Sequence, residues 1–207
     1  VILIPANEVK FVPKHNFTQF GLLPAIVGNL TAKGFVHPTP IQDECIPLIL
    51  AGHDIIGLAN TGTGKTAAFA LPIIQLIKSA KEAKSVIAIA PTRELALQIE
   101  DEFRLFSRGM DFRTALCVGG SNMFKQKQNL SRNPHAIIGT PGRLVDLINQ
   151  GALKLGSTKI LVLDEFDRML DMGFINDIKT IVGKMHKDRQ SLCFSATISN
   201  DIKKNLD

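Results

Sequence analysis

Tryptophan and tyrosine are absent from this chain of 207 residues, and cysteine is scarce, with only three residues. Stacking on an aromatic ring must therefore use one of twelve phenylalanines or a histidine. Cys45, Cys117 and Cys193 are too widely separated for a local metal-binding motif. We expect three small buried side chains in a reducing compartment, the cytoplasm or the nucleus.

Long apolar runs and a secretory leader are also missing. No apolar run reaches the roughly 18 residues of a membrane span, so we expect no membrane contact. The opening residues lack the basic start of a signal peptide and meet Pro5 at once. The chain begins with Val1 rather than Met, and we expect it to be a fragment. Its length favours one domain, and 45% hydrophobic with 21% charged residues is a globular composition.

Positive charge is concentrated in one part of the sequence. The whole chain carries +5, whereas residues 103–145 hold seven Arg or Lys residues against Asp111 alone, a net +6. One interpretation is a solvated helical face. The other is a footprint for the phosphate backbone of a nucleic acid.

Strand-like and helix-like segments alternate along the chain. Several strand candidates are continuously apolar, as strands buried on both faces are. We therefore predict an α/β fold, a parallel sheet sandwiched by helices, preceded by an irregular lead-in over residues 1–16. Ligands of such sheets bind where the strands end. The predicted strands are Asp54–Ala59, Ser85–Ala90, Thr114–Val118, Ala136–Thr140, Lys159–Asp164 and Ser191–Ser195; the predicted helices are Leu23–Ala32, Ile41–Leu50, Lys65–Lys78, Arg93–Arg108, Asn122–Leu130, Arg143–Gln150 and Ile175–Met185.

A phosphate-binding loop follows the first predicted strand. Its glycines let backbone N–H groups approach phosphate oxygens, and the next helix begins there. Lys65 can neutralise phosphates, and the Thr66 hydroxyl can bind Mg²⁺. The motif indicates nucleotide binding, although Ala59 stands where the general pattern has glycine. The loop comprises Ala59, Asn60, Thr61, Gly62, Thr63, Gly64, Lys65 and Thr66.

Carboxylates follow the fifth predicted strand. Asp164 is placed to hold Mg²⁺, and Glu165 to orient or deprotonate an attacking water. Asp167 could cap a helix or bond the hydroxyls of Ser195 and Thr197, which follow the sixth strand.

Two more strand ends carry a hydroxyl, a helix start and an arginine. These are Thr92-Arg93 and Thr140-Pro141-Gly142-Arg143, and Gly119-Gly120 follows a third strand. Such groups suit the phosphates of a nucleic-acid strand. Each taken singly is equally an ordinary helix start or turn.

In this order, these motifs resemble the first RecA-like domain of a DEAD-box RNA helicase. The resemblance extends from Phe17 to Thr197. Residues 34–42 look like the family's Q motif, with Phe17 as the upstream aromatic residue. Residues 59–66 resemble motif I, in which this family has alanine at the first place. The other matches are residues 91–96 to motif Ia, 119–120 to the glycine doublet, 140–143 to motif Ib, 164–167 to motif II and 195–197 to motif III.

The resemblance implies an ATP- and Mg²⁺-dependent RNA helicase domain over residues 17–207. Gln42 would read the adenine edge, and Phe17 would stack on the adenine ring. Lys65 and the rest of motif I would bind the phosphates, Thr66 and Asp164 the metal, and Glu165 would be the catalytic base. RNA backbone contacts would fall to Arg93, Gly119, Gly120, Thr140, Gly142 and Arg143, and Asp167, Ser195 and Thr197 would couple the ATP state to RNA binding.

One departure and one missing part qualify the resemblance. Phe166 replaces the alanine of the family name, which raises the alternative of an RNA clamp that binds ATP without hydrolysing it. A DNA helicase of a neighbouring family is a third hypothesis, which the Q motif disfavours. The second RecA-like domain of such enzymes would lie outside these residues, so we expect this chain to be nearly inactive alone.

Overall fold

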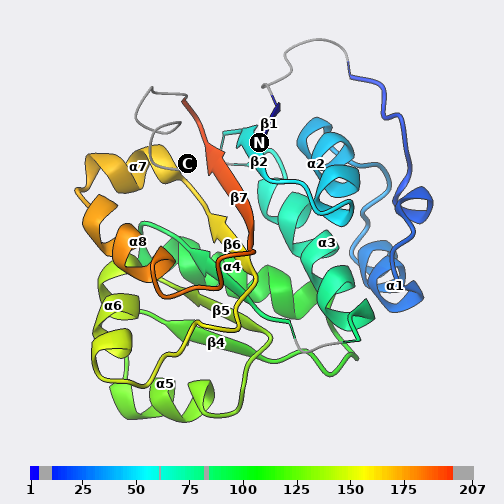
Figure 1. Cartoon of the computed structure of the whole chain (residues 1–207). Helices are drawn as coiled ribbons and strands as arrows, with labels where there is room; N and C mark the ends of the chain where they lie inside the picture. The colour runs from blue at the N-terminus through cyan, green and yellow to red at the C-terminus, as the bar shows by residue number, and fades with distance from the viewer. Residues whose placement is uncertain (5–10, 61, 82–83, 198–207) are drawn as a thin grey trace.

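A computed structural model describes residues 1–4, 11–60, 62–81 and 84–197 of the chain. These residues form a seven-stranded sheet in the order β1-β2-β7-β6-β3-β5-β4 (Figure 1). Every neighbouring pair is parallel. The predicted α/β fold with a parallel sheet is confirmed.

All six predicted strands are present, within one residue of the expected bounds. Their alternate side chains enter different cores, because successive residues of a strand point to opposite faces. Val86 and Ala88 pack on one side of β3, and Ile87 and Ile89 on the other. This two-sided burial explains the continuous apolar runs. The six strands are β2 (Ile55–Leu58), β3 (Val86–Ile89), β4 (Thr114–Cys117), β5 (Ala136–Gly139), β6 (Ile160–Leu163) and β7 (Gln190–Ser195).

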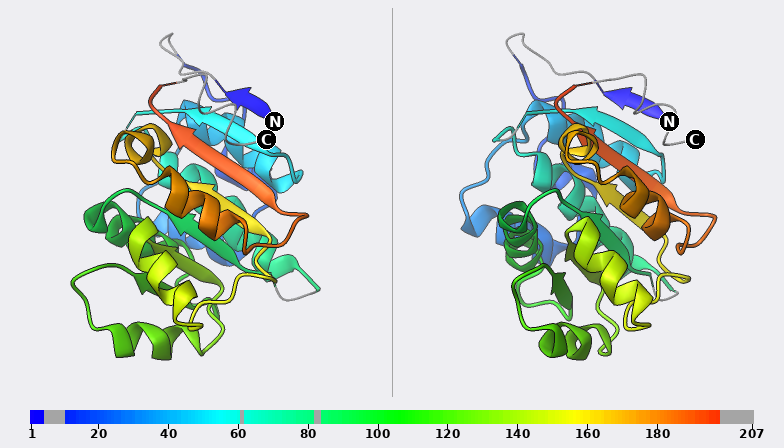
Figure 2. Two further views of the ribbon diagram at one scale, coloured as in Figure 1. Left: turned by 60° about the vertical axis from the view of Figure 1, so that its left-hand side comes forward. Right: turned by 90° about the vertical axis from the view of Figure 1, so that its left-hand side faces the viewer.

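The helices form a layer on each face of the sheet (Figures 1 and 2). One layer contains α1 (Pro24–Ala32), α2 (Pro40–Leu50), α3 (Lys65–Ser79) and α4 (Arg93–Phe106). The other contains α5 (Met123–Leu130), α6 (Pro141–Asn149), α7 (Phe166–Asp171) and α8 (Ile175–Val182). Three of them, α1, α2 and α6, begin with proline, which has no N–H to leave unbonded at a first helical position. For that reason α6 begins two residues before its predicted start.

The prediction of an irregular lead-in is wrong for residues 2–4, which form β1 (Ile2–Ile4) beside β2. This edge strand has only three residues, and Leu3 is 46% exposed, so that it lacks the two-sided burial of the inner strands. The 3₁₀ turn η1 (Phe17–Phe20) and helix α7 were also not predicted. All three cysteines are free and buried, as expected.

Candidate functional site

The phosphate-binding loop lies between β2 and α3, at the carboxyl edge of the sheet. Gly62 and Gly64 have φ values of 86° and 81°, a backbone conformation that glycine adopts without steric cost. Gly64 caps α3, and the first turn of that helix contains no acidic residue, so its N-terminal dipole is available to an anion. Thr63 Oγ1 donates to Asn60 O over 2.8 Å and closes the loop. The predicted Thr61 lies outside the described residues.

The first residue of α3 pairs with the first carboxylate after β6. Lys65 Nζ lies 2.7 Å from Asp164 Oδ1, and both side chains are buried. Burial raises the pKa of Asp164, and the Lys65 ammonium opposes that rise. Asp164 Oδ2 is buried and has no hydrogen-bond partner among the described residues. A carboxylate oxygen left over in this way fits the predicted Mg²⁺ site, because hard divalent cations prefer oxygen ligands.

Glu165 adopts a strained backbone conformation where α7 begins. Its φ and ψ are both 51°, the left-handed region that costs a non-glycine residue about 1–2 kcal/mol. Arg168 Nη1 lies 3.2 Å from Glu165 Oε2 and holds the carboxylate. Phe166, next in the chain, is 1% exposed and lies in the core beneath α7 and α8. The fold thus accommodates phenylalanine at this position with both carboxylates in place.

Asp167 joins α7 to the residues after β7. Its Oδ2 accepts hydrogen bonds from the N–H groups of Ala196 and Thr197 and from Thr197 Oγ1, at 3.1–3.2 Å. Ser195 does not take part: its buried hydroxyl has no hydrogen-bond partner among the described residues. The predicted contact of Asp167 is therefore correct for Thr197 and wrong for Ser195. Ser195 is the last residue of β7 and its side chain is buried, whereas Thr197 lies beyond the end of the strand and is exposed.

These strand ends surround a depression of about 480 Å³. It brings together predicted residues from three separate segments of the chain. Arg168 and Asp171 of α7 also line it, and neither was predicted from the sequence. Its lining is Ala59, Asn60, Lys65, Glu165, Asp167, Arg168, Asp171 and Ala196.

Glu102 of α4 is a further acidic residue beside this site, and it was not predicted from the sequence. Burial raises the pKa of Glu102 to about 7; a hydrogen bond with the Thr66 side chain opposes the rise, and the Asp164 carboxylate adds to it. Little in the sequence signals it, because Glu102 lies outside the buried face of α4, which consists of Ala96, Ile99, Glu100, Phe103 and Phe106.

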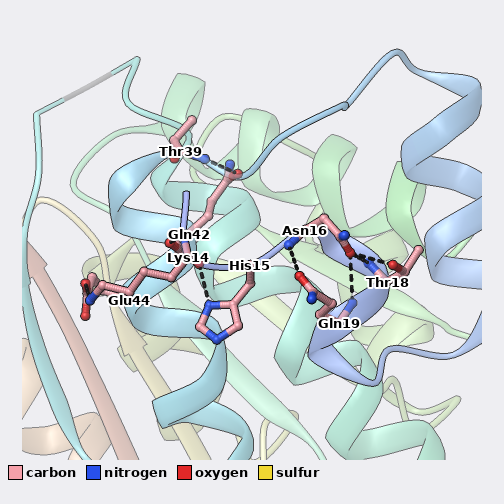
Figure 3. Close-up of polar contacts among 9 residues, drawn as sticks. Lys14, His15, Asn16, Thr18, Gln19, Thr39, Gln42 and Glu44 are labelled. Atoms are coloured by element: carbon pink, nitrogen blue, oxygen red, sulfur yellow. Dashed lines mark hydrogen bonds and ion pairs between the residues drawn. The ribbon is translucent and has the colours of Figure 1, made fainter. Parts of the chain in front are cut away.

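Gln42 links α2 to the phosphate-binding loop. The side chain is 1% exposed. Its Oε1 accepts from Thr39 N–H, which caps α2 (Figure 3), and its Nε2 donates to Gly64 O, both over 3.0 Å. A Cβ on Gly64 would lie 2.4 Å from Gln42 Nε2, so this close approach requires glycine.

Hydrogen bonds to Asp43 link the residues before η1 to α2. Asp43, 2% exposed, accepts from Lys14 N–H over 2.7 Å and lies 2.6 Å from His15 Nδ1. Figure 3 shows Lys14 and His15 beside this helix, followed by the Asn16 cap of η1. Phe17 is therefore held in place, 4% exposed, with its ring edge-on to those of Phe20 and Phe35.

The arginines of the predicted RNA surface bind the protein backbone. Arg93 Nη1 donates to Gly119 O over 3.0 Å, and Arg143 Nη1 donates to Ser121 O over 3.3 Å. The Arg143 side chain, 15% exposed, also contacts Gln126 Oε1 and Asp146. The two arginines thus hold the same loop after β4, in which Gly120 has a φ of 70°. Thr140 and Gly142 lie nearby, at the start of α6.

Comparison with known proteins decides the family. The sequence profile of the DEAD/DEAH box helicases matches residues 39–205. The chain belongs to this family. A crystal structure of a DEAD box protein from the hyperthermophile Methanococcus jannaschii superimposes with a TM-score of 0.87 at 40% identity, over 93% of this chain and 53% of that one.

Relatives of this DEAD-box chain include bacterial helicases. ATP-dependent RNA helicase CshA of Listeria monocytogenes is 47% identical over 188 residues, 91% of this chain and 36% of the relative. ATP-dependent RNA helicase DeaD of Buchnera aphidicola is 43% identical over 189 residues, 91% of this chain and 31% of the relative. The chain therefore spans about a third of the length of these relatives. Within the described residues, no helix is both long and apolar enough to cross a bilayer.

Proposed function

We propose that this chain is the ATP-binding half of an ATP-dependent RNA helicase, which couples ATP binding and hydrolysis to RNA unwinding or to remodelling of RNA–protein complexes. The buried Lys65–Asp164 pair at the edge of the 480 Å³ depression carries the proposal. It unites the phosphate-binding loop with the carboxylate that such enzymes need, and the family membership supports it.

Nucleotide binding would exchange partners inside this site. Lys65 would turn from the Asp164 carboxylate to phosphate oxygens, so that one anion replaces another. Asp164 and the Thr66 hydroxyl would then hold Mg²⁺, which when bound neutralises phosphate charge. The backbone N–H groups of Gly62 to Lys65 would bind the remaining phosphate oxygens.

Adenine recognition would use the residues around α2. Gln42 would present its amide to the adenine edge, and Phe17 would stack on the base from its aromatic cluster. Because the same amide contacts Gly64 O in the structure, adenine recognition would be linked to the conformation of the phosphate-binding loop.

Glu165 would orient and deprotonate the attacking water. The left-handed backbone and the contact with Arg168 support a fixed direction of its carboxylate. Preorganisation of this kind lowers the cost of reaching the transition state.

RNA binding would use the loops at the same edge. Arg93 and Arg143 would position the Gly119–Ser121 loop, and the backbone of Gly119 and Gly120 would contact RNA phosphates. Thr140 and Gly142 would offer the start of α6 to the next phosphate. Asp167 and Thr197 would carry the nucleotide state to this surface through their direct contact. Such backbone contacts carry no sequence preference.

A second RecA-like domain of the full-length protein would complete the enzyme. In related phosphoryl transfers an arginine finger contributes about 10³–10⁵ in rate, and we propose that the second domain supplies it. A clamp without turnover is the weaker candidate, because Phe166 is accommodated in the core. The buried thiols suit a reducing compartment, for which we propose the cytoplasm.

The isolated chain and the full-length protein provide the test. Residues 1–207 should bind ATP with almost no RNA-stimulated hydrolysis, and adding the second domain should restore stimulation. Robust stimulation of residues 1–207 alone, at concentrations too low for self-association, would contradict the proposal. ATP binding by the full-length protein without turnover would favour the clamp.

A further inference from the structure

A second, larger cavity lies at the opposite edge of the sheet from the phosphate-binding loop. Its volume is about 850 Å³. The residues that precede β3, β4, β5 and β6 line it, together with the last turns of α3 and α5 and the loop after α6. Because all strands are parallel, this edge is remote from every residue of the proposed helicase site.

The lining of this cavity is strongly basic. It contains six Lys or Arg residues and no Asp or Glu. Two of the six cations have a partner: Arg113 Nη1 lies 2.9 Å from Asp111 Oδ1, and Lys78 Nζ donates to Asp111 O over 2.9 Å. Glu82 lies outside the described residues. The described residues supply no ion pair to the remaining four cations, Lys81, Lys84, Lys127 and Lys154.

Helix ends alone do not account for this charge. Cations in a last helical turn offset the helix dipole, which explains Lys78 and Lys127. Lys84, Arg113 and Lys154 lie outside helices, yet they face the same space. Like charges gathered in a concave wall repel one another, and they raise the local concentration of anions.

Uncharged groups complete a wall suited to phosphate. Ser131, Ser157 and Asn133 line the cavity beside the cations. His135 Nδ1 accepts from Arg113 N–H over 3.0 Å, and its ring stacks on Phe112. Burial lowers the pKa of His135, and Arg113 and Lys78 lower it further, which favours the neutral ring. Because Nδ1 accepts a hydrogen bond, the hydrogen of the neutral ring is on Nε2, where it is available as a donor. Hydroxyl, amide and imidazole donors among cations are the usual partners of phosphate oxygens.

The basic stretch over residues 103–145 is divided between the two edges of the sheet. Arg143 lies at the helicase edge, whereas Arg113 and Lys127 face this cavity, where cations from outside the stretch join them. We propose that the cavity is a second RNA site, which holds the phosphates of a strand outside the helicase cleft. The choice of RNA over other polyanions rests on the proposed function. The inference that the cavity binds phosphates rests on its own lining and is independent of that function.

The experiment measures binding of a labelled single-stranded RNA to the full-length protein without nucleotide, by fluorescence anisotropy over a range of salt concentrations. The test variant is Lys127→Gln/Lys154→Gln, and the matched control is Lys33→Gln/Lys179→Gln, which removes the same charge from exposed positions of α8 and of the end of α1. Lys154→Gln alone, in an exposed loop, serves if the double variant fails to fold.

We expect the test variant to bind RNA about tenfold more weakly and its salt slope to fall by about 1.4, since each phosphate contact to a single strand adds about 0.7. The control should keep the slope and the affinity. Equal losses in both variants, or no loss in either, would overturn the proposal.

Two further arms identify the ligand and separate this proposal from the proposed function. Tripolyphosphate should compete only weakly with the labelled RNA. The RNA assignment would be refuted if tripolyphosphate bound the unaltered protein at micromolar concentration and the test variant lost that binding while its RNA affinity stayed unchanged. The cavity would then be a site for small oligophosphates. RNA-stimulated ATP hydrolysis at saturating RNA should survive in the test variant. If the unaltered protein shows no such stimulation but the variant loses RNA affinity, the proposed function fails and the second site stands.

Discussion

Replacing Gln42 with alanine tests the link between α2 and the phosphate-binding loop. The change removes two hydrogen bonds of 3.0 Å from a side chain that is 1% exposed. Gly64 O keeps one partner, the N–H of Ala68. Thr39 N–H loses the side-chain acceptor, and an unsatisfied buried donor costs about 1–3 kcal/mol. With the small void left behind, we expect the free energy of unfolding to fall by about 2–4 kcal/mol.

The same variant separates adenine recognition from loop support in a nucleotide-binding assay. If Gln42 also reads the base, ATP affinity should fall by about 1–3 kcal/mol, or roughly 5- to 150-fold, and GTP affinity much less. Equal losses for ATP and GTP would refute the adenine role and leave only support of the loop. Gln98→Ala on the exposed face of α4 is the matched control, with an expected change within about 0.5 kcal/mol. Unchanged urea unfolding and unchanged ATP affinity in Gln42→Ala would refute both roles.

Three more predictions concern the carboxylates and the RNA surface. Glu165→Gln in the full-length protein should abolish ATP hydrolysis and leave ATP affinity unchanged, because shape is kept and the base is lost; near-normal turnover would contradict the assignment. Burial holds the pKa of Glu102 near 7, above its usual value of 4.5, so this residue makes the protein less stable as the pH rises from about 4.5 through 7. In urea unfolding, the free energy of unfolding of Glu102→Gln should therefore fall less between pH 5 and 8 than that of the unaltered protein, by up to about 3 kcal/mol. Parallel pH profiles of the two proteins would refute this assignment of the pKa. Arg143→Gln should lower stability by about 1–2 kcal/mol and weaken unrelated RNAs equally in anisotropy assays, because it loosens the loop at Ser121; a loss confined to one RNA sequence would count against a backbone role.

The sequence was sufficient for the sheet because its inner strands are buried on both faces. Val86–Ile89 and Ile160–Leu163 are continuously apolar, and so short a run between polar segments is typical of a strand covered on both sides. Ile2–Ile4 has only one buried residue, and α7 has only six residues, too few to show a helical period. Local pattern therefore failed where an element is short and its stability comes from packing.

Which residues form the site could be predicted from the sequence, but the direction of several side chains could not. Lys65, Asp164 and Glu165 each follow a predicted strand, and parallel strands end at the same edge of a sheet, so their proximity was expected. Sequence alone did not tell that Arg93 and Arg143 turn toward the loop at Gly119–Ser121. Nor did it distinguish Ser195 from Thr197 as the partner of Asp167, because that depends on which way the end of β7 faces.

The most direct test of the account is the rate of ATP hydrolysis by the full-length protein with saturating RNA, with DNA of the same sequence, and with neither. We predict strong stimulation by RNA, little by DNA, and none in Glu165→Gln. Equal rates in all three conditions, or equal stimulation by RNA and DNA, would contradict the assignment of this chain to an ATP-dependent RNA helicase.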